Sequence, residues 1–212
     1  MSLEGYLEST LLRPDARIEE IEKLCSEARQ YDLCGICVNP YYIALASTCL
    51  QGSEVYPVTV IGFPLGGDGS NVKAYAAERA VKNGAREIDM VINIGALKDG
   101  HKKEITDEIS LVVNTGVTVK VIIETGYLSS TEIALACQCV VEGGADFVKT
   151  STGFGPRGTS TNDIHLLRSL LPLSVQIKAA GGIKTADFAR ELIYAGAARI
   201  GTSSAYDIIK EG

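Results

Sequence analysis

The stretch "GGADFVK", residues 143–149, joins the end of one kind of local structure to the start of another. Its Gly-Ala step suits the C-terminal end of a helix, and the β-prone run that follows suits a buried strand. The same phrase recurs as "NGAREID" at 83–89 and as "AGAARIG" at 195–201. Three copies of one helix-to-strand junction predict a repeated β/α unit.

Outward from these junctions, short β-branched runs alternate with amphipathic stretches along the whole chain. We expect strands at 6–11, 33–38, 57–63, 86–93, 118–124, 145–151, 175–180 and 198–202. Eight strands alternating with helices predict a parallel sheet closed into a (β/α)8 TIM barrel, with residues 1–212 forming a single domain. The alternative, an open doubly wound sheet, is not supported because no G-x-G-x-x-G motif follows the first strand.

Helix start and stop residues agree with this division. Pro14 suits a first helical turn, and "SSTE" at 129–132 resembles a capping box. Gly84, Gly143 and Gly196 suit C-terminal stops.

Composition narrows the class of protein. The 212 residues carry a formal charge of −6 with no basic block, which argues against nucleic acid or an anionic membrane as a partner. No apolar run reaches the roughly 18 residues of a spanning helix, and the N-terminus lacks the features of a signal peptide. We therefore expect a cytoplasmic protein.

The cysteines and histidines do not form a recognisable redox or metal site. Cys34 and Cys37 make a nominal C-x-x-C, but they lie in a strand-like run, where residues three apart face opposite ways. We interpret them as small buried hydrophobic residues. His101 and His165 lie far apart without zinc-ligand spacing and are expected at the surface or at helix caps. Neither a metal nor a cofactor is expected.

Lys149 is the residue that most needs an explanation, because an ammonium group buried in a strand without a partner costs several kcal/mol. Asp89, Lys149 and Lys178 fall on the fourth, sixth and seventh predicted strands, so their side chains can converge in the mouth of the barrel. If only one such lysine were present, we would interpret it as part of a buried ion-pair network that fixes the register of the strands. A second lysine on the neighbouring strand favours a function.

That function follows from the chemistry of amines. A lysine with the usual pKa of about 10.4 is neutral in only about one molecule in a thousand at pH 7.4. Burial lowers that pKa, and a second ammonium at about 4 Å adds about 4 kcal/mol of repulsion at an effective dielectric constant of about 20, or close to three pKa units. The neutral amine of such a pair can attack a carbonyl carbon and form a Schiff base, with Asp89 moving protons.

Two glycine-rich loops predict a phosphate site. "AAGGIKT" at 179–185 and "RIGTSSAYD" at 199–207 follow the seventh and eighth strands, where barrels of this class bind phosphate. Lys184 could add positive charge, and Ser203 and Ser204 could donate hydroxyl groups.

Together, "FVKTSTGFG", "EIDMVINIG", "VKVIIETGYL", "IKAAGGI" and "RIGTSS" resemble the deoxyribose-phosphate aldolase family, and "TLLRPDA" and "CGICVNPYYI" extend the match. The resemblance implies a class I aldolase that cleaves 2-deoxy-D-ribose 5-phosphate reversibly into D-glyceraldehyde 3-phosphate and acetaldehyde. It implies that Lys149 forms the Schiff base, that Lys178 depresses its pKa and that Asp89 transfers protons. The implied phosphate ligands are Gly153, Gly181, Gly182, Gly201, Ser203 and Ser204. The family also forms homo-oligomers, which we expect here.

Two departures from the family pattern affect proton transfer. Glu8-Ser9-Thr10 stands where the family usually carries Asp-His-Thr, and the sequence ends at Gly212 without the tyrosine-bearing tail of some members. We therefore expect slower or differently routed proton transfer. Arg157 is expected to be solvated rather than bound to substrate phosphate.

Three other functions stay open from the sequence. One is a Schiff-base aldolase for another aldehyde or sugar phosphate, and the second is a non-catalytic barrel that binds sugar phosphates. The third, a zinc-dependent aldolase, is opposed by the absent histidine cluster.

Overall fold

The computed structural model describes residues 2–211. Its strands are β1 (Leu7–Leu11), β2 (Gly35–Val38), β3 (Tyr56–Ile61), β4 (Glu87–Val91), β5 (Thr118–Ile122), β6 (Phe147–Lys149), β7 (Gln176–Ala180) and β8 (Arg199–Thr202). Its α-helices are α1 (Ile18–Gln30), α2 (Ile43–Cys49), α3 (Ser70–Lys82), α4 (Ile94–Lys98), α5 (Lys102–Val113), α6 (Ser130–Gly143), α7 (Thr161–Leu170), α8 (Ala186–Tyr194) and α9 (Ala205–Glu211). Short 3-10 helices are η1 (Glu4–Tyr6), η2 (Pro40–Tyr42) and η3 (Thr125–Tyr127).

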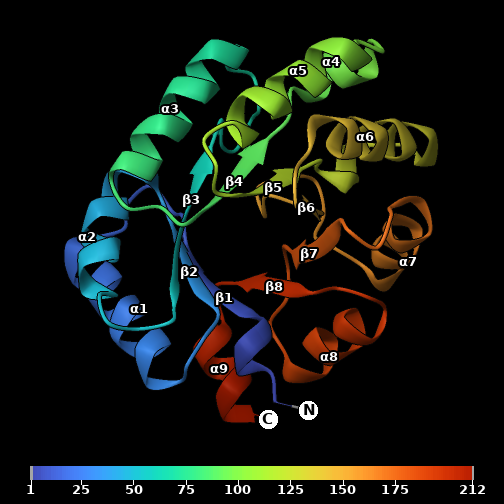
Figure 1. The fold of residues 1–212 in the computed structure, drawn as a ribbon. Coiled ribbons are helices and arrows are strands. Elements are labelled where there is room, and N and C mark those ends of the chain that lie inside the picture. The colour runs from blue at the N-terminus through green and yellow to red at the C-terminus, as the bar shows by residue number, and fades with distance from the viewer. Residues whose placement is uncertain (1, 212) are drawn as a thin grey trace.

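The strands close into a barrel, as predicted. Each strand is parallel to its neighbours in chain order, and β1 pairs with β8 to complete the ring. Figure 1 shows the helices surrounding the strands, with the first and last elements side by side. The three junctions found in the sequence lead into β4, β6 and β8. The (β/α)8 prediction is therefore confirmed.

The capping signals were partly right. Ser129 and Glu132 form the expected capping box of α6, in which the Ser129 N–H donates to Glu132 Oε2 at 2.7 Å. Gly84 and Gly196 follow helix ends with φ of +97° and +117°, values that favour glycine.

Two positions differ from the prediction. Pro14 lies in a turn, and α1 begins later, at Ile18, because the Glu20 carboxylate accepts the N–H of Arg17 and caps the helix there. Gly143 is the last residue of α6. Gly144 has the left-handed φ of +80° and ends the helix, so the stop was placed one residue early.

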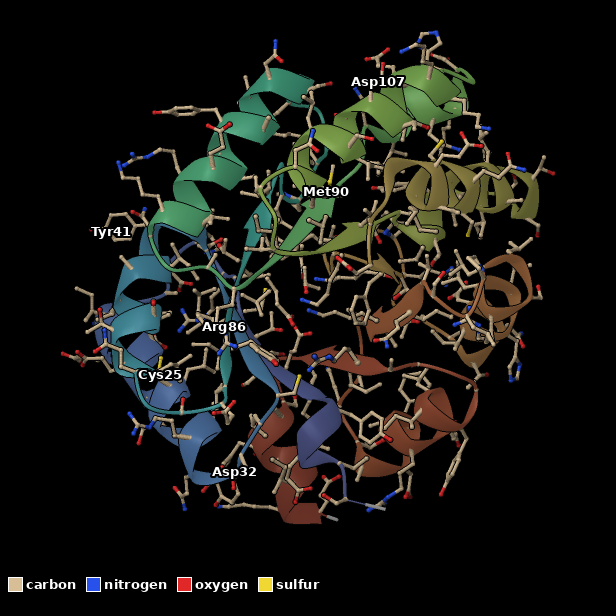
Figure 2. The ribbon with its side chains drawn as sticks, in the orientation of Figure 1. Cys25, Asp32, Tyr41, Arg86, Met90 and Asp107 are labelled. Atoms are coloured by element: carbon tan, nitrogen blue, oxygen red, sulfur yellow. The ribbon has the colours of Figure 1, made fainter. Side chains whose placement is uncertain are left out.

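Strand residues alternate between an apolar layer and the barrel interior. In β4, Ile88 and Met90 belong to the hydrophobic core between strands and helices, whereas the intervening Glu87 and Asp89 contact charged groups inside the barrel. Figure 2 shows Met90 inside the molecule and Asp107 at its edge. The strand period of two therefore delivers polar side chains to the interior without breaking the apolar layer.

Within residues 2–211, no helix combines the length and apolar character that crossing a bilayer requires.

Candidate active site

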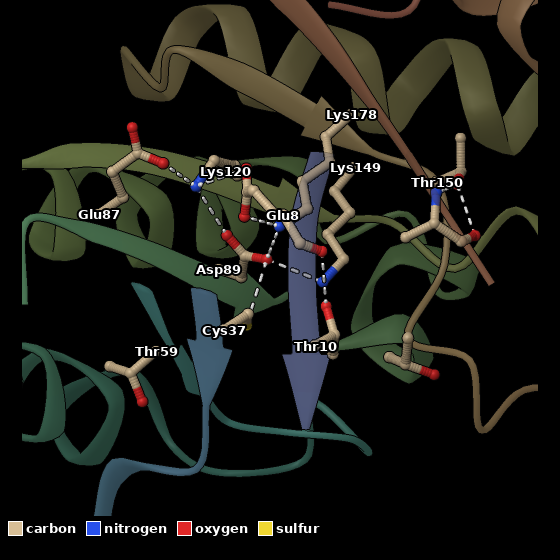
Figure 3. Close-up of polar contacts among 12 residues, drawn as sticks. Glu8, Thr10, Cys37, Thr59, Glu87, Asp89, Lys120, Lys149, Thr150 and Lys178 are labelled. Atoms are coloured by element: carbon tan, nitrogen blue, oxygen red, sulfur yellow. Dashed lines mark hydrogen bonds and ion pairs between the residues drawn. The ribbon is translucent and has the colours of Figure 1, made fainter. Parts of the chain in front are cut away.

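The pairing of the strands fixes which side chains meet inside the barrel. Lys149 of β6 is in register with Lys178 of β7, and Asp89 of β4 is in register with Lys120 of β5. Residues in register on adjacent parallel strands project to the same face of the sheet. Figure 3 shows the four side chains converging from these strands.

Asp89 joins the two predicted lysines. Its Oδ2 atom lies 2.8 Å from Lys149 Nζ and 2.7 Å from Lys178 Nζ. The two amine nitrogens can therefore be no farther apart than about 5.5 Å, the sum of these distances. Lys178 and Asp89 are fully buried, and Lys149 retains 3% of its surface exposed. The three residues chosen from the sequence thus meet at one carboxylate oxygen.

The cluster is larger than the sequence analysis proposed. Lys120 Nζ lies 3.1 Å from Asp89 Oδ1, 3.6 Å from Glu8 Oε1 and in direct contact with Glu87. Lys120 interrupts the β-branched run "TVKVII" as Lys149 interrupts its own strand, so the same criterion could have found it. Glu87, two residues before Asp89, shares its face of β4 and was missed as well.

Glu8, which departs from the family pattern, is part of this cluster. Its carboxylate contacts Lys178 and lies near Lys120, and the side chain is fully buried. Gly35 leaves room for it, because an added Cβ there would lie 3.4 Å from the Glu8 side chain and 3.0 Å from a backbone oxygen. The longer side chain of glutamate therefore reaches the strand lysines across the barrel.

Opposing charges set the protonation of this cluster. Burial acts to raise the pKa of Asp89, but Lys120, Lys149 and Lys178 hold that pKa well below its usual range. Burial acts to lower the pKa of Lys178, but the carboxylates of Asp89 and Glu8 outweigh it and raise the pKa. The pKa of Lys120 is raised for the same reasons, against its burial. Asp89 is thus held as a carboxylate, and Lys120 and Lys178 are held as ammonium groups.

The count of charges sets Lys149 apart. Three carboxylates, those of Glu8, Glu87 and Asp89, face Lys120, Lys178 and Arg199, whose Nη2 lies 3.6 Å from Glu87 Oε1. The formal charges of these six groups cancel, and Lys149 is a further amine beside them, in contact with Asp89.

A cavity of about 190 Å³ opens beside Lys149 at the C-terminal ends of the strands. Of the predicted phosphate ligands, the residues that line it are Gly153, Gly181, Gly182, Gly201 and Ser203. Ser204 is not among the lining residues, and its N–H donates to Thr202 Oγ1 at 2.9 Å. Lys184 lines the cavity as suggested. Sequence reasoning missed the other polar residues that line the cavity, which are Thr10, Arg13, Thr152 and Thr202.

Two of these glycines allow a close approach that a side chain would prevent. A Cβ added at Gly201 would lie 2.9 Å from Lys178 Cε, so the missing side chain lets Lys178 pass. Gly181 has φ of +93°, and an added Cβ would lie 3.2 Å from Ser151 Cβ. At these two positions, β8 and the loop after β7 therefore come close to Lys178 and to the chain just after Lys149.

Arg157 is exposed to solvent, as expected, and is not among the residues that line the cavity. Its guanidinium makes two contacts with the Asp163 carboxylate, at 2.6 and 2.8 Å, and also donates to the carbonyl oxygens of Thr125 and Gly158. These contacts tie the loop after β6 to the first turn of α7, so the exposed side chain also has a structural role.

Cys34 and Cys37 are free thiols at β2, of which Cys37 is buried as expected and Cys34 is only partly buried. Cys37 is fully buried with Sγ 4.0 Å from Asp89 Oδ2, and burial raises its pKa to about 11. Burial likewise raises the pKa of Cys34, which contacts Arg199, to about 12. His101 and His165 are exposed. Within residues 2–211, no three His, Cys, Asp or Glu side chains are grouped as metal ligands.

Comparisons with known proteins agree with this geometry. Residues 8–211 match the sequence model described as DeoC/LacD family aldolase. The chain is 47% identical to a deoxyribose-phosphate aldolase of Bdellovibrio bacteriovorus, over all of this chain and 97% of that protein. It superimposes with a TM-score of 0.96 on the solved aldolase QR15, which is 38% identical, over all of this chain and 96% of that one.

A tetrameric deoxyribose phosphate aldolase from Aeropyrum pernix superimposes with a TM-score of 0.90 at 33% identity, covering 98% of this chain and 89% of that one. Fold, site and sequence thus lead to one assignment: this chain belongs to the DeoC/LacD family of aldolases and is an enzyme of the lyase class.

Proposed function

We propose that this aldolase cleaves 2-deoxy-D-ribose 5-phosphate reversibly into D-glyceraldehyde 3-phosphate and acetaldehyde through a Schiff base on Lys149. The observation that carries the proposal is the position of Lys149, whose amine lies at a cavity, 2.8 Å from a carboxylate that it shares with a second lysine. Relatives named deoxyribose-phosphate aldolase, 44–48% identical over nearly the whole chain, support the choice of substrate.

The protonated imine draws the electron pair of the breaking carbon–carbon bond toward its nitrogen. The neutral Lys149 amine attacks C1 of the open-chain sugar, and loss of water gives a protonated Schiff base. As the C3 hydroxyl loses its proton, the C2–C3 bond breaks, and its electron pair forms the enamine. D-glyceraldehyde 3-phosphate leaves, C2 of the enamine takes up a proton, and water hydrolyses the imine to release acetaldehyde.

Lys178 and Asp89 support this sequence in different ways. Lys178 stays positive beside Asp89 and Glu8, and a fixed positive charge within about 5.5 Å opposes a second one on Lys149. Asp89 accepts hydrogen bonds from both amines. Because its pKa is held low, Asp89 passes a proton onward rather than storing it.

The glycine-rich loops that line the same cavity suit the substrate phosphate. The N–H groups of Gly153, Gly182 and Ser203 border the cavity and have no hydrogen-bond partner within residues 2–211. Unpaired backbone N–H groups on glycine-rich loops suit a phosphate, and Lys184 brings a positive charge.

Trapping the intermediate tests the proposal directly. Borohydride added with acetaldehyde should reduce an imine to a stable adduct, and peptide mapping should place that adduct on Lys149. An active enzyme whose Lys149 peptide stays unmodified would overturn the proposal.

The role of Lys178 has its own test. Replacing Lys178 by leucine removes the positive charge that opposes protonation of Lys149, so the neutral amine should form only at higher pH. We expect the acidic limb of the pH profile of kcat/KM to move upward by about one unit or more. A profile that keeps its position would show that Lys178 has no electrostatic role.

We also propose that the enzyme forms a homo-oligomer, as expected from the resemblance. The tetrameric state of the Aeropyrum pernix protein supports this proposal. Light scattering of the purified chain should give a mass at least twice that of one chain, and a monomer at micromolar concentration would contradict it.

A further inference from the structure

Glu124 is an unusual residue at the end of β5. Its backbone has φ of +54° and ψ of +67°, a left-handed conformation that costs a non-glycine residue about 1 kcal/mol or more. Its side chain is buried, although carboxylates are seldom buried without a cation. One carboxylate oxygen, Oε1, is buried without a hydrogen-bond partner within residues 2–211. Such a combination lowers stability and calls for a function.

The contacts of Glu124 go to the loop that follows Lys149. Its Oε2 atom accepts the backbone N–H of Thr152 at 3.0 Å and also the Thr152 hydroxyl. The same hydroxyl oxygen accepts the N–H of Phe154 at 3.0 Å. Thr152 Oγ1 is therefore occupied as both donor and acceptor. Between these fixed points lies Gly153, with φ of +88°.

The packing around the carboxylate fixes its position. A Cβ added at Gly155 would lie 2.7 Å from Glu124 Cδ, so the loop backbone lies directly on the carboxylate. Next to Glu124, the N–H of Thr125 donates to the Thr150 carbonyl at 2.9 Å. The end of β5 thus holds the loop after β6 both before and after Gly153.

From this geometry we propose that Glu124 is a positioning residue that, through Thr152, aims the Gly153 N–H at the substrate phosphate. Gly153 lines the cavity, and its N–H is without a partner within residues 2–211. Its Cα lies 3.6 Å from the Cβ position built on Gly181, so the loops after β6 and β7 meet at this point.

The inference rests on the proposed function, but it assigns Glu124 to binding and not to bond cleavage. No hydrogen bond or ion pair links Glu124 to the lysine cluster within residues 2–211. Loss of the Glu124 contact should therefore weaken recognition of phosphate and leave imine formation on Lys149 intact.

The experiment compares a phosphorylated and an unphosphorylated substrate. For Glu124→Ala, we expect kcat/KM for 2-deoxyribose 5-phosphate to fall about 10- to 100-fold, mainly through a higher KM, because the N–H loses its orientation. The value for 2-deoxyribose, which lacks the phosphate, should change less than threefold. Glu124→Gln keeps an oxygen acceptor for Thr152 and should recover much of the loss.

Two more variants keep the test decisive. Thr152→Val removes the hydroxyl that links Glu124 to Phe154, and it should also lower the preference for the phosphorylated substrate. This variant replaces Glu124→Ala in the test if Glu124→Ala does not fold. Thr125→Val is the matched control. It is a buried neighbour whose hydroxyl has no hydrogen-bond partner within residues 2–211, so it should preserve the preference.

Borohydride trapping with acetaldehyde, which carries no phosphate, should be equally efficient in wild type and Glu124→Ala. Equal losses on both substrates, or an unchanged preference in Glu124→Ala and Thr152→Val, would overturn the positioning role. Failure of wild-type trapping would instead overturn the proposed Schiff base, so the two failures are distinguishable.

Discussion

Two buried lysines in this enzyme have different surroundings. Lys149 lies inside the barrel, and Lys73 lies on α3, outside it. Lys73 is completely buried, with Nζ 2.9 Å from Glu108 Oε1, and it donates to the carbonyl oxygens of Gly66 at 2.8 Å and Val91 at 2.9 Å. Its three partners match the three hydrogens of an ammonium group.

The difference teaches that burial and a lowered pKa do not by themselves identify a nucleophile. Burial lowers the pKa of Lys73 more than the Glu108 carboxylate raises it. By that criterion alone, Lys73 would be a candidate nucleophile. It has no route to a substrate, however, because its side chain is fully buried and its contacts tie the segment after β3 to the end of β4. Lys149 differs because it borders a cavity.

The largest expected effect separates the two lysines by activity. Lys149→Ala should lower kcat/KM by more than about 10³-fold, because it removes the attacking atom. The loss of stability should be small, because Asp89 keeps Lys120 and Lys178 as partners. Lys73→Met should keep kcat within about threefold, measured per folded molecule. Steady-state kinetics beside thermal unfolding would check both. A folded Lys149→Ala enzyme with substantial turnover would break the comparison.

The second effect separates them by stability. Lys73→Met leaves Glu108 buried without its cation, so the free energy of unfolding should fall by about 3–5 kcal/mol in urea titrations. Adding Glu108→Leu removes the stranded carboxylate and should recover a large part of that loss. If the double variant is as unstable as the single one, the stranded charge is not the cause.

The two lysines also show what the sequence could and could not predict. A lysine inside a β-branched strand is conspicuous, so Lys149 and Lys178 were found, and Lys120 could have been. Lys73 lies in the helical stretch "NVKAYAAERAVKNG", where lysine is ordinarily solvent-exposed and nothing local indicates burial. The repeated junctions predicted the barrel, because they report local α-to-β order.

The prediction was incomplete where long-range contacts decide. Three contacts depend on strand register and loop geometry. They are the bridge of Asp89 between both amines, the contact of Glu8 with Lys178, and the hydrogen bonds of Glu124 with Thr152. Local sequence specifies neither the register nor the loop geometry.

The smallest expected effect is on how the stability of the protein depends on pH. Glu8 and Glu108, the carboxylates of the two lysine sites, should change this dependence in opposite ways. Burial acts to raise the pKa of Glu8, but Lys120 and Lys178 outweigh it and lower the pKa below 4.5. Burial raises the pKa of Glu108 above 4.5, against the pull of Lys73. In the folded protein, the pKa of Glu8 therefore lies below 4.5, the ordinary pKa of glutamate, and the pKa of Glu108 lies above it.

The sign of the pH effect follows from which state binds protons first. Below pH 4.5 the unfolded chain protonates Glu8 before the folded protein does, so the stability that Glu8 contributes is lost as pH falls toward its folded pKa. Above pH 4.5 the folded protein protonates Glu108 first, so acidification toward pH 4.5 relieves a penalty. Urea titrations of Glu8→Gln should show a shallower loss of stability than wild type below pH 4.5. Those of Glu108→Gln should show a steeper loss between pH 7 and 4.5. Parallel curves for all three proteins would mean that the two carboxylates do not differ in the way that their lysine partners and burial require.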